Sequence, residues 1–449
     1  MAVHTVSDDQ TARPQGVEAP LELTTDLPRT LGWFDQTTMW GSFGISLFGP
    51  VSGALIVATT GDLTLALVAT AVGCALGGVI LGASAVFGSV TGAPAMVTMR
   101  GMFGRRGSVL PTVINITQNI GWATMEITLI STAASQAMGG QSRRWVYVLV
   151  AGAIATTMAI RPLGSVRLIR KIMVWLVLAA TAYLFYQVFQ HPLGDIPQGG
   201  VVGFWPAVDL GIAGIVSFAP LAADYSRHSN TNRAAFGSAF IGYGGAALIY
   251  YALGVFAVAA LATNSTDVVK ALVALPAGAV MLGILAVDEV DEAFANIYST
   301  TMSAHNLIPR VDRRVISAAI GVVATLLAIV VDINGYADFL FLIGSVFVPL
   351  FAAAAVDFFV VCKMRWDVSD QARFRWAPVV AWLGGFVAYQ LVYPGTLAGW
   401  SGFWYDVQGW LHFTPPSWLG SSIASTVVAA SLAIVLGLAS ARRRNDVSP

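Results

Sequence analysis

A series of apolar segments, each about 20 residues long, recurs along the whole length of this chain. An α-helix of that length spans the hydrocarbon core of a bilayer, and backbone groups in lipid must find their hydrogen bonds within the protein. The pattern therefore predicts an all-α polytopic membrane protein with about twelve transmembrane helices. Their expected centres lie near residues 48, 74, 123, 154, 180, 213, 248, 287, 323, 346, 384 and 430.

The composition excludes an ordinary soluble protein. Of the 449 residues, 56% are hydrophobic and 11% are charged, and the mean hydropathy is +0.71. A soluble domain carries roughly 25% charged residues. The two cysteines, Cys74 and Cys362, lie in or beside apolar spans and predict neither a disulfide nor a metal centre. We expect a monomer in the cell membrane, surrounded by lipid, with no cofactor and no nucleic-acid partner.

Basic residues are distributed unevenly between alternate loops. With the N-terminus inside, 21 of the 24 lysines and arginines fall on the cytoplasmic side, and only Arg143, Arg144 and Lys270 lie outside. The positive-inside rule then predicts an even number of spans with both termini cytoplasmic. Residues 1–30 and 442–449 are expected to be cytoplasmic tails.

Four carboxylates interrupt one of the most apolar spans: Asp288, Glu289, Asp291 and Glu292. Charge at membrane depth costs several kcal/mol, so ionisable residues there usually serve an ion or substrate path. Polar residues at helical spacing share one face of this span: Asp288, Glu292, Asn296, Ser299 or Thr300, and Ser303. A helix with such a stripe lines a cavity or packs against another polar helix. The stripe therefore indicates transport.

Two spans carry residues that interrupt a helix. The first reads MWGSFGISLFGPVSG, and the sixth contains Gly211, Gly214 and Pro220. Irregular backbone at membrane depth is tolerated where it lines a cavity, and transporters use it to present carbonyls and helix ends to ions. The interruptions are five spans apart, as two inverted five-helix repeats would place them.

Three motifs resemble the nucleobase–cation symporter family one, which contains purine, cytosine, hydantoin and allantoin permeases. The segment after span 2 fits R-x-x-F-G-x-x-G-S-x-x-P with Arg100, Phe103, Gly104, Gly107, Ser108 and Pro111. The end of span 6 reads ADYSR, with Asp224, Tyr225 and Arg227. QNIGW in span 3 supplies a third match, and the resemblance runs from about Gly32 to at least residue 360.

The resemblance implies a leucine-transporter-type architecture. Residues 31–365 would form a ten-helix core of two inverted repeats, at about 31–192 and 198–365. Residues 366–441 would add two peripheral helices joined by an external aromatic loop. The family places its substrate at the bilayer midplane between spans 1, 3, 6 and 8. It implies a secondary active permease rather than an enzyme, which imports a nitrogen heterocycle together with sodium or protons.

The resemblance also implies a set of substrate-binding residues. Trp122 would stack on a flat heterocycle, and Asn119 and Glu126 share its helix face. The aromatic that the family carries in span 6 is Ile215 here, and Phe218 one turn later is its expected replacement. Phe48 and Asn296 complete the expected site. Three residues are assigned to structural or gating roles: Arg100, Asp224 and Arg227.

The coupling ion is expected to bind between spans 1 and 8. The family's sodium site uses carbonyls, here near Phe43 and Leu47, together with two adjacent hydroxyl residues in span 8. In this chain those hydroxyl positions fall on Glu292 and Ala293. Burial favours the protonated form of a carboxylate, and Asp288 nearby adds like-charge repulsion, so proton coupling is favoured. A register shifted by two turns would instead bring Ser299 and Thr300 to the site and restore sodium.

Glu126 bears on the kind of substrate. Family members with the hydantoin-type pattern tend to carry a glutamine at this spacing, whereas a carboxylate accepts hydrogen bonds from ring or exocyclic N–H groups. We therefore expect a cytosine- or purine-type nucleobase or a related compound. A cationic vitamin of the thiamine or pyridoxine type, or an amine or amino acid carried by the same architecture, remains the alternative.

Overall fold

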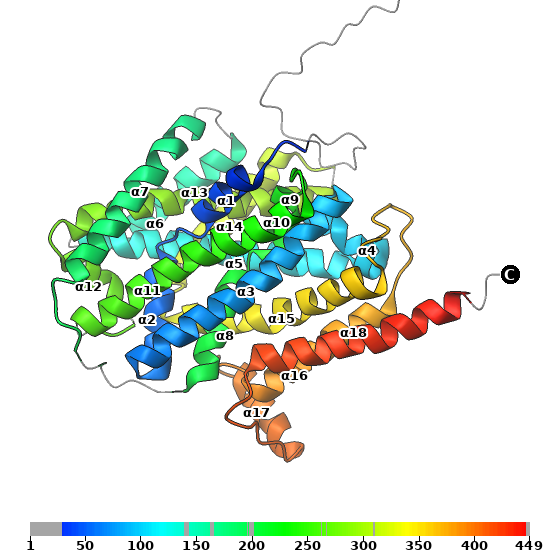
Figure 1. Cartoon of the computed structure of the whole chain (residues 1–449). Coiled ribbons are helices and arrows are strands. Elements are labelled where there is room, and N and C mark those ends of the chain that lie inside the picture. Colours follow the sequence, from blue (N-terminus) through cyan, green and yellow to red (C-terminus); the bar gives the residue numbers. More distant parts are fainter. Residues whose placement is uncertain are drawn as a thin grey trace, which may run out of the picture.

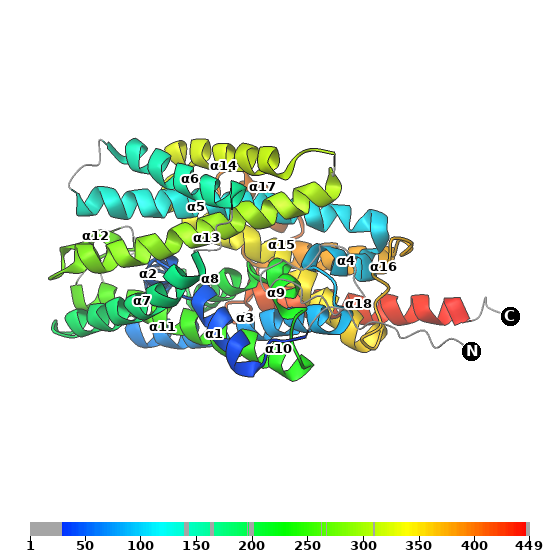
Figure 2. The ribbon, with the colours of Figure 1, turned by 90° about the horizontal axis from the view of Figure 1, so that it is seen from above.

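The computed structural model describes residues 29–445, apart from residues 139–142, 162–165, 195, 197–201, 262, 266 and 309. The expected N-terminal tail lies outside the described residues up to residue 28. Most of the described chain is helical, and the long helices run roughly side by side in one bundle (Figures 1 and 2).

Each of the twelve predicted centres falls within a helix. These helices are α2 (Phe48–Thr60), α3 (Leu63–Thr91), α5 (Val109–Ala137), α6 (Arg144–Ile160), α7 (Val166–Val188), α8 (Phe204–Val216), α11 (Gly244–Leu261), α13 (Gly278–Leu307), α14 (Arg313–Val330), α15 (Tyr336–Val356), α16 (Trp376–Val392) and α18 (Ser421–Asn445). The all-α prediction is confirmed. Because α18 continues to Asn445, the segment that we expected to be a C-terminal tail begins as helix.

Shorter helices lie between or beside these spans. They are α1 (Trp33–Phe43), α4 (Ala95–Gly107), α9 (Ala222–Ser226), α10 (Asn232–Ser238), α12 (Val268–Ala274) and α17 (Trp400–Trp410). The segment after span 2, which we expected to be a loop between two spans, forms α4 and the start of α5. The aromatic loop between the last two spans contains α17.

Within the described residues, six helices are long and apolar enough to cross a membrane by length and hydropathy alone, and the bent pair α1 and α2 makes a seventh span. Other predicted spans do not meet these length and hydropathy criteria, for reasons that the sequence explains. α6 and α16 have 17 residues each, and α5 and α13 carry polar and charged side chains along one face. The polar exceptions are the helices that build the site described below.

Both predicted helix breaks are present. α1 and α2 are bent by 66° where residues 44–47 separate them. Gly44 sits there because a Cβ atom on it would lie 2.7 Å from the Tyr243 carbonyl oxygen. In span 6, α8 ends at Val216, a 3-10 turn spans Ala219–Leu221 around Pro220, and α9 follows. Glycine and proline therefore mark the breaks, as the sequence indicated.

The packing of the helices follows the expected repeat. α2 packs against α11 and α3 against α8, so the first span of each half contacts the second span of the other half. α5 packs against α13 and α6 against α14, so the third spans of the two halves contact each other, as do the fourth spans. Small residues allow the close approach. A Cβ on Gly53 would lie 1.8 Å from the Tyr251 carbonyl oxygen, and one on Gly254 would lie 2.0 Å from the Pro50 carbonyl oxygen.

The two last spans pack on the outside of this core. α16 and α18 contact each other along their length, and both contact α15. Asp209 of α8, which is buried, fixes the beginning of α18: its carboxylate accepts hydrogen bonds of 3.0 Å from the backbone N–H groups of Ser421 and Ser422. Less than a third of the most apolar part of α18 is buried within the protein.

Candidate functional site

A small cavity lies where both broken spans meet α5, α11, α13 and α15. Its volume is about 30 Å³, which is room for about two water molecules. The residues that line it are Gly44, Ser46, Phe48, Gly49, Trp122, Glu126, Gly214, Phe218, Tyr243, Ala247, Tyr251, Glu292 and Tyr336. Polar and aromatic groups from both halves of the chain therefore converge on one point.

Three carboxylates gather at this cavity. Glu126 comes from α5, and Glu289 and Glu292 come from α13. One oxygen of each lies within 4.8 Å of the others, and Glu126 and Glu289 are buried. At an effective dielectric constant of about 20, two like charges at that separation repel by roughly 3.5 kcal/mol. The cluster therefore favours bound protons or a bound cation over three free negative charges.

Glu289 joins this cluster to the break in span 1. Its Oε2 accepts a hydrogen bond of 2.8 Å from the backbone N–H of Leu47, and the Ser46 hydroxyl donates to both carboxylate oxygens at 3.1 and 3.2 Å. Leu47 immediately precedes α2, so the carboxylate sits at the N-terminal end of that helix, where negative charge is favourable. A change of charge at Glu289 would therefore alter the hydrogen bonds that it accepts from the residues just before α2.

Glu126 and Glu292 retain acceptor oxygens that face the cavity. Asn296 donates from Nδ2 to Glu126 Oε1 at 2.7 Å and to the Glu292 carbonyl oxygen at 3.3 Å. Glu126 Oε2 and Glu292 Oε1 are buried without a hydrogen-bond partner among the described residues. Buried acceptors of this kind are costly unless a ligand or a proton satisfies them.

Aromatic rings form one wall of the cavity. The ring centroid of Trp122 lies 5.6 Å from that of Phe48 and 6.0 Å from that of Tyr336, and both contacts are edge to face. Trp122 Nε1 is buried without a partner in the described part of the chain. The wall thus offers flat apolar surface together with one N–H donor, while the glutamates offer acceptors.

The structure brings most of the sequence-predicted substrate residues together. Trp122, Glu126, Phe218 and Phe48 all line the cavity, as does Glu292. Asn296 does not line the cavity but donates a hydrogen bond to Glu126, which does.

Asn119 is placed differently from these residues. It is buried but does not line the cavity, and its Oδ1 accepts a bond of 3.3 Å from Gln118 Nε2. The same Gln118 nitrogen donates to the Ser217 carbonyl oxygen at 2.9 Å, which ties α5 to the break in span 6.

Glu289 is the site residue that sequence reasoning missed. The expected helix face carried Asp288, but the structure brings Glu289 to the glutamate cluster in its place. Glu289, Glu292 and Asn296 are spaced three and four apart, but Asp288 also has helical spacing to Glu292, so spacing alone did not distinguish the two acids. Tyr251 and Tyr336 were also missed, since single tyrosines in apolar spans have no distinctive spacing.

The hydroxyl groups of the alternative sodium site lie elsewhere. Thr300 is buried and donates to the Asn296 carbonyl oxygen at 2.7 Å. Ser299 lines a second cavity of about 370 Å³, which we call the vestibule. Its lining residues are Leu31, Met39, Pro94, Met96, Val97, Asp224, Tyr225, Arg227, His228, Tyr298, Ser299, Met302 and Ser303.

Aromatic side chains separate the vestibule from the glutamate cavity. Tyr225 lines the vestibule, and Phe218 and Tyr243 line the cavity. Phe43, at the end of α1, bridges the two groups, with ring centroids 4.7 Å from Tyr225 and 6.0 Å from Phe218. Tyr243 lies 4.8 Å from Phe218. These four rings, the aromatic barrier, must part before a heterocycle can pass between the two spaces.

The residues assigned to structural or gating roles meet at α4. Asp224 accepts a hydrogen bond of 2.8 Å from the backbone N–H of Ala95, the first residue of α4, and Arg227 attracts the same carboxylate. Arg100, within α4, forms an ion pair of 2.7 Å with Asp370 in the segment between α15 and α16. α4 therefore connects the end of span 6 to that segment.

The comparisons with known proteins agree with this geometry. A model of the family described as permeases for cytosine/purines, uracil, thiamine and allantoin matches residues 25–389. No curated protein matches the chain. Mhp1 in an inward-facing conformation is similar with a TM-score of 0.73 at 16% identity, over 94% of this chain and 92% of that one.

Two further solved structures are similar. Mhp1, described as a nucleobase–cation-symport-1 family transporter, in a closed conformation with bromovinylhydantoin bound, gives a TM-score of 0.72 at 16% identity, over 96% and 97% of the two chains. A manganese transporter of Eremococcus coleocola gives 0.52 at 13% identity, over 93% and 99%. At these identities the likeness concerns the fold, which is that of the leucine-transporter type. Since the family model covers most of the sequence, the chain belongs to the family of membrane permeases for cytosine/purines, uracil, thiamine and allantoin, and it is a transporter rather than an enzyme.

Proposed function

We propose that this permease imports a flat nitrogen heterocycle that presents N–H donors, of the cytosine or purine type, together with protons. The observation that carries the proposal is the cluster of Glu126, Glu289 and Glu292 beside the ring of Trp122. A ring lying on Trp122 would direct its N–H groups to the free oxygens of Glu126 and Glu292. Hydantoins offer fewer donors relative to their carbonyls and would fit this arrangement less well.

Protons are favoured as the coupling ion because three glutamates gather at the cavity, whereas the Ser299 and Thr300 hydroxyl groups of the alternative sodium site lie away from it. Glu292 would carry the proton. Glu289, which lies beside it, would connect a change in the charge of the cluster to α2 through its hydrogen bonds from Leu47 and Ser46. Sodium remains chemically reasonable, because hard cations favour oxygen ligands. The two ions predict different results when each gradient is imposed alone.

The direct test measures uptake into proteoliposomes that contain the purified protein. An inward proton gradient without sodium should drive accumulation of radiolabelled cytosine or adenine, and a protonophore should abolish it. Accumulation that requires sodium and ignores the proton gradient would overturn proton coupling. Uptake of neither nucleobase under either gradient would overturn the substrate class.

A cationic heterocycle of the thiamine type is the second candidate, and one observation favours it. Two glutamates line the cavity, a third stands beside them, and no lysine, arginine or histidine is among the lining residues. Such a site suits a ring with a fixed positive charge. Thermal stabilisation of the purified protein separates the candidates, since a ligand at a hundred times its Kd should add about 2.7 kcal/mol of stability.

A further inference from the structure

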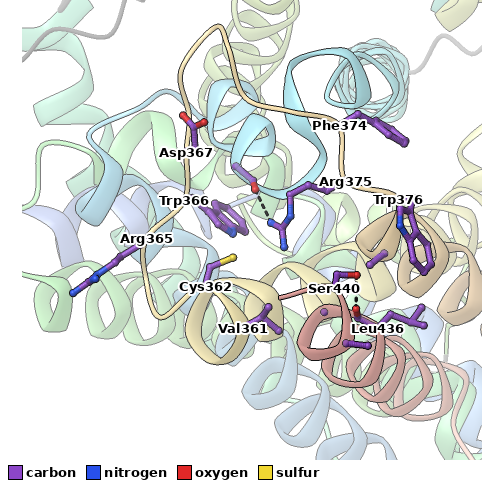
Figure 3. Close-up of a pocket in the computed structure, with 14 residues that line it drawn as sticks. Val361, Cys362, Arg365, Trp366, Asp367, Phe374, Arg375, Trp376, Leu436 and Ser440 are labelled. Atoms are coloured by element: carbon purple, nitrogen blue, oxygen red, sulfur yellow. Dashed lines mark hydrogen bonds between the residues drawn. The ribbon is translucent and has the colours of Figure 1, made fainter. Parts of the chain in front are cut away.

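A third cavity, of about 630 Å³, lies outside the transport path (Figure 3). It is bounded by α4, the end of α15 with its last turn Asp357–Val361, the start of α16 and the end of α18. Its lining residues are Gly101, Val361, Cys362, Arg365, Trp366, Asp367, Phe374, Arg375, Trp376, Ala377, Leu436, Gly437, Ala439 and Ser440. We call it the peripheral cavity. Its volume is typical of a small-molecule site.

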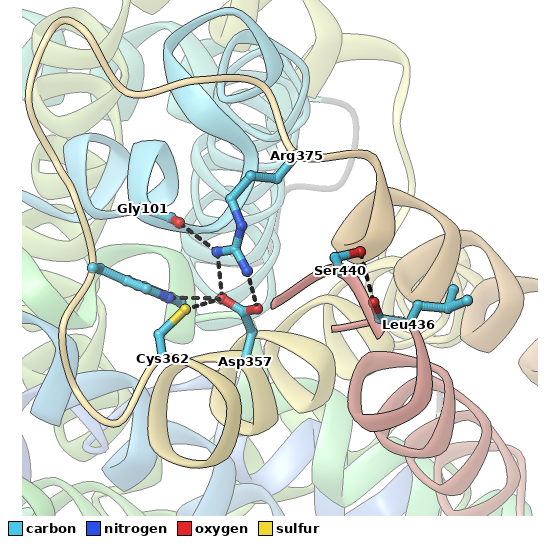
Figure 4. A network of polar contacts seen from close by, with 7 residues as sticks. Gly101, Asp357, Cys362, Arg375, Leu436 and Ser440 are labelled. Carbon is cyan, nitrogen blue, oxygen red and sulfur yellow. Dashed lines mark hydrogen bonds and ion pairs between the residues drawn. The ribbon is translucent and has the colours of Figure 1, made fainter. Parts of the chain in front are cut away.

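The floor of the peripheral cavity is a rigid polar network. Arg375 donates to both oxygens of the buried Asp357, at 2.6 and 2.8 Å, and to the Gly101 carbonyl oxygen at 2.8 Å (Figure 4). Trp366 Nε1 donates to the same carboxylate at 2.8 Å, and the Cys362 thiol lies 3.6 Å from it. Three side chains thus make four hydrogen bonds to one carboxylate and hold it in place.

One wall of the cavity is apolar and comes from α18, which packs on the outside of the core. Leu436, Gly437 and Ala439 belong to the end of this helix, where Gly437 is buried and Ala439 is exposed. At the opposite side, Phe374 and Trp376 are 55% and 53% exposed. Aromatic rings that are half exposed beside a membrane-facing helix are typical of the interface between lipid headgroups and hydrocarbon.

The end of the bundle that holds this cavity is strongly basic. Seven cationic side chains lie on α4 and on the segment from residue 363 to residue 375: Arg100, Arg105, Arg106, Lys363, Arg365, Arg373 and Arg375. Three carboxylates oppose them: Asp357, Asp367 and Asp370. Hydrogen bonds from Ser369 hold the pKa of Asp367 below its usual range, so it is counted as charged. This end of the bundle therefore carries more positive than negative side chains.

We propose that the peripheral cavity binds an anionic phospholipid of the cytoplasmic leaflet. The acyl chains would lie along the apolar wall of α18, and the phosphate would rest at the basic rim. Arg365 is exposed and extends outward at that rim, where its long side chain can reach a headgroup (Figure 3). Basic pockets between transmembrane helices on the cytoplasmic side are known to suit such headgroups. The excess of positive charge selects an anionic lipid over a zwitterionic one.

Native mass spectrometry provides the test, with the protein released from nanodiscs of equal parts phosphatidylglycerol and phosphatidylcholine. One phosphatidylglycerol should be retained in preference to phosphatidylcholine. Arg365→Gln should lower its retention at least threefold, and Arg106→Gln, which removes an exposed charge from the same end but outside the cavity, should not. Ala439→Trp places a bulky ring in the cavity and should also lower retention at least threefold, whereas Leu438→Trp, on the outward face of α18, should not.

Cys362 localises the bound lipid without any substitution, since Cys74, the second cysteine, is buried. N-ethylmaleimide should label Cys362 at least threefold more slowly in phosphatidylglycerol than in phosphatidylcholine, and Ala439→Trp should remove that dependence on lipid. Equal retention of both lipids, or retention that survives Ala439→Trp, would overturn the proposal. So would protection of Cys362 by inorganic phosphate in phosphatidylcholine alone, because the site would then recognise a free anion.

Discussion

At the scale of single residues, the chemistry of the site is concentrated in three glutamates, one on α5 and two on α13. The sequence predicted two of them. Glu126 and Glu292 were expected at the site, and the structure places both there. Glu289 was not singled out. In a run of four acids, each step turns the helix face by about 100°, so the choice between Asp288 and Glu289 depends on a rotation that packing alone decides.

Replacing Glu292 with glutamine tests the coupling proton. Glu292→Gln should abolish concentrative uptake and leave substrate exchange partly intact, because a neutral amide can still contact the ring but cannot release a proton. Asp291→Asn removes a neighbouring charge outside the cluster and should retain accumulation. Unchanged accumulation in Glu292→Gln would remove this residue from the coupling step.

Trp122 is predicted to contribute the flat surface on which the ring lies. Trp122→Ala should weaken substrate affinity at least tenfold, which corresponds to about 1.4 kcal/mol. Trp122→Phe keeps an aromatic face and should restore part of the loss. Equilibrium binding to the purified protein measures the effect, and wild-type affinity in the alanine variant would show that the ring lies elsewhere.

At the scale of the elements, breaks and close contacts could be predicted better than polar connections. Glycine and proline located both helix breaks. No pattern in the sequence indicated that Asp209 would fix the beginning of α18, because the partners of a single acid in an apolar span become known only with the fold. α4 was missed as a helix because the segment from Arg100 to Gly107 contains three arginines and three glycines, a composition typical of a loop.

The contact between α2 and α11 predicts a large difference between two glycines of the same helix. Gly254→Ala would place a methyl group 2.0 Å from the Pro50 carbonyl oxygen and should cost roughly 1–3 kcal/mol. Gly245→Ala meets no atom within 4 Å and should be neutral or slightly stabilising. Thermal unfolding in detergent compares the two, and equal melting temperatures would contradict the packing described for this pair.

The ion pair of Asp357 and Arg375 predicts non-additive stability. Arg375→Ala leaves a buried carboxylate without its main partner and should cost about 3–5 kcal/mol. In the double variant Asp357→Asn with Arg375→Ala, the uncompensated charge is gone, and we expect at least a third of that loss to be recovered. Strictly additive losses in thermal unfolding would show that the two side chains act independently.

At the scale of the whole molecule, the number of spans followed from hydropathy and the distribution of basic residues, whereas the pairing of the helices followed only from the family resemblance. Hydropathy carries no information on which span packs against which. The glutamate cavity illustrates the limit, since its lining residues come from segments as far apart as Gly44 and Tyr336.

The orientation in the membrane leads to a labelling prediction in intact cells. In a background of Cys362→Ser, Trp410→Cys in α17 should react with a membrane-impermeant maleimide added outside, because Trp410 is 80% exposed. Phe374→Cys, at the basic end, should react only after permeabilisation. Reaction of both positions from the same side would contradict the topology expected from the positive charges.

The small size of the glutamate cavity has a consequence for measured affinities. A space of about 30 Å³ cannot hold a heterocycle. Protein molecules in this conformation therefore do not bind substrate in the cavity. The apparent dissociation constant then equals the intrinsic one divided by the fraction of molecules that are open. With about one molecule in a hundred open, binding would be measured about a hundredfold too weak. An antibody fragment that held the aromatic barrier apart would recover that factor without a single new contact to the ligand.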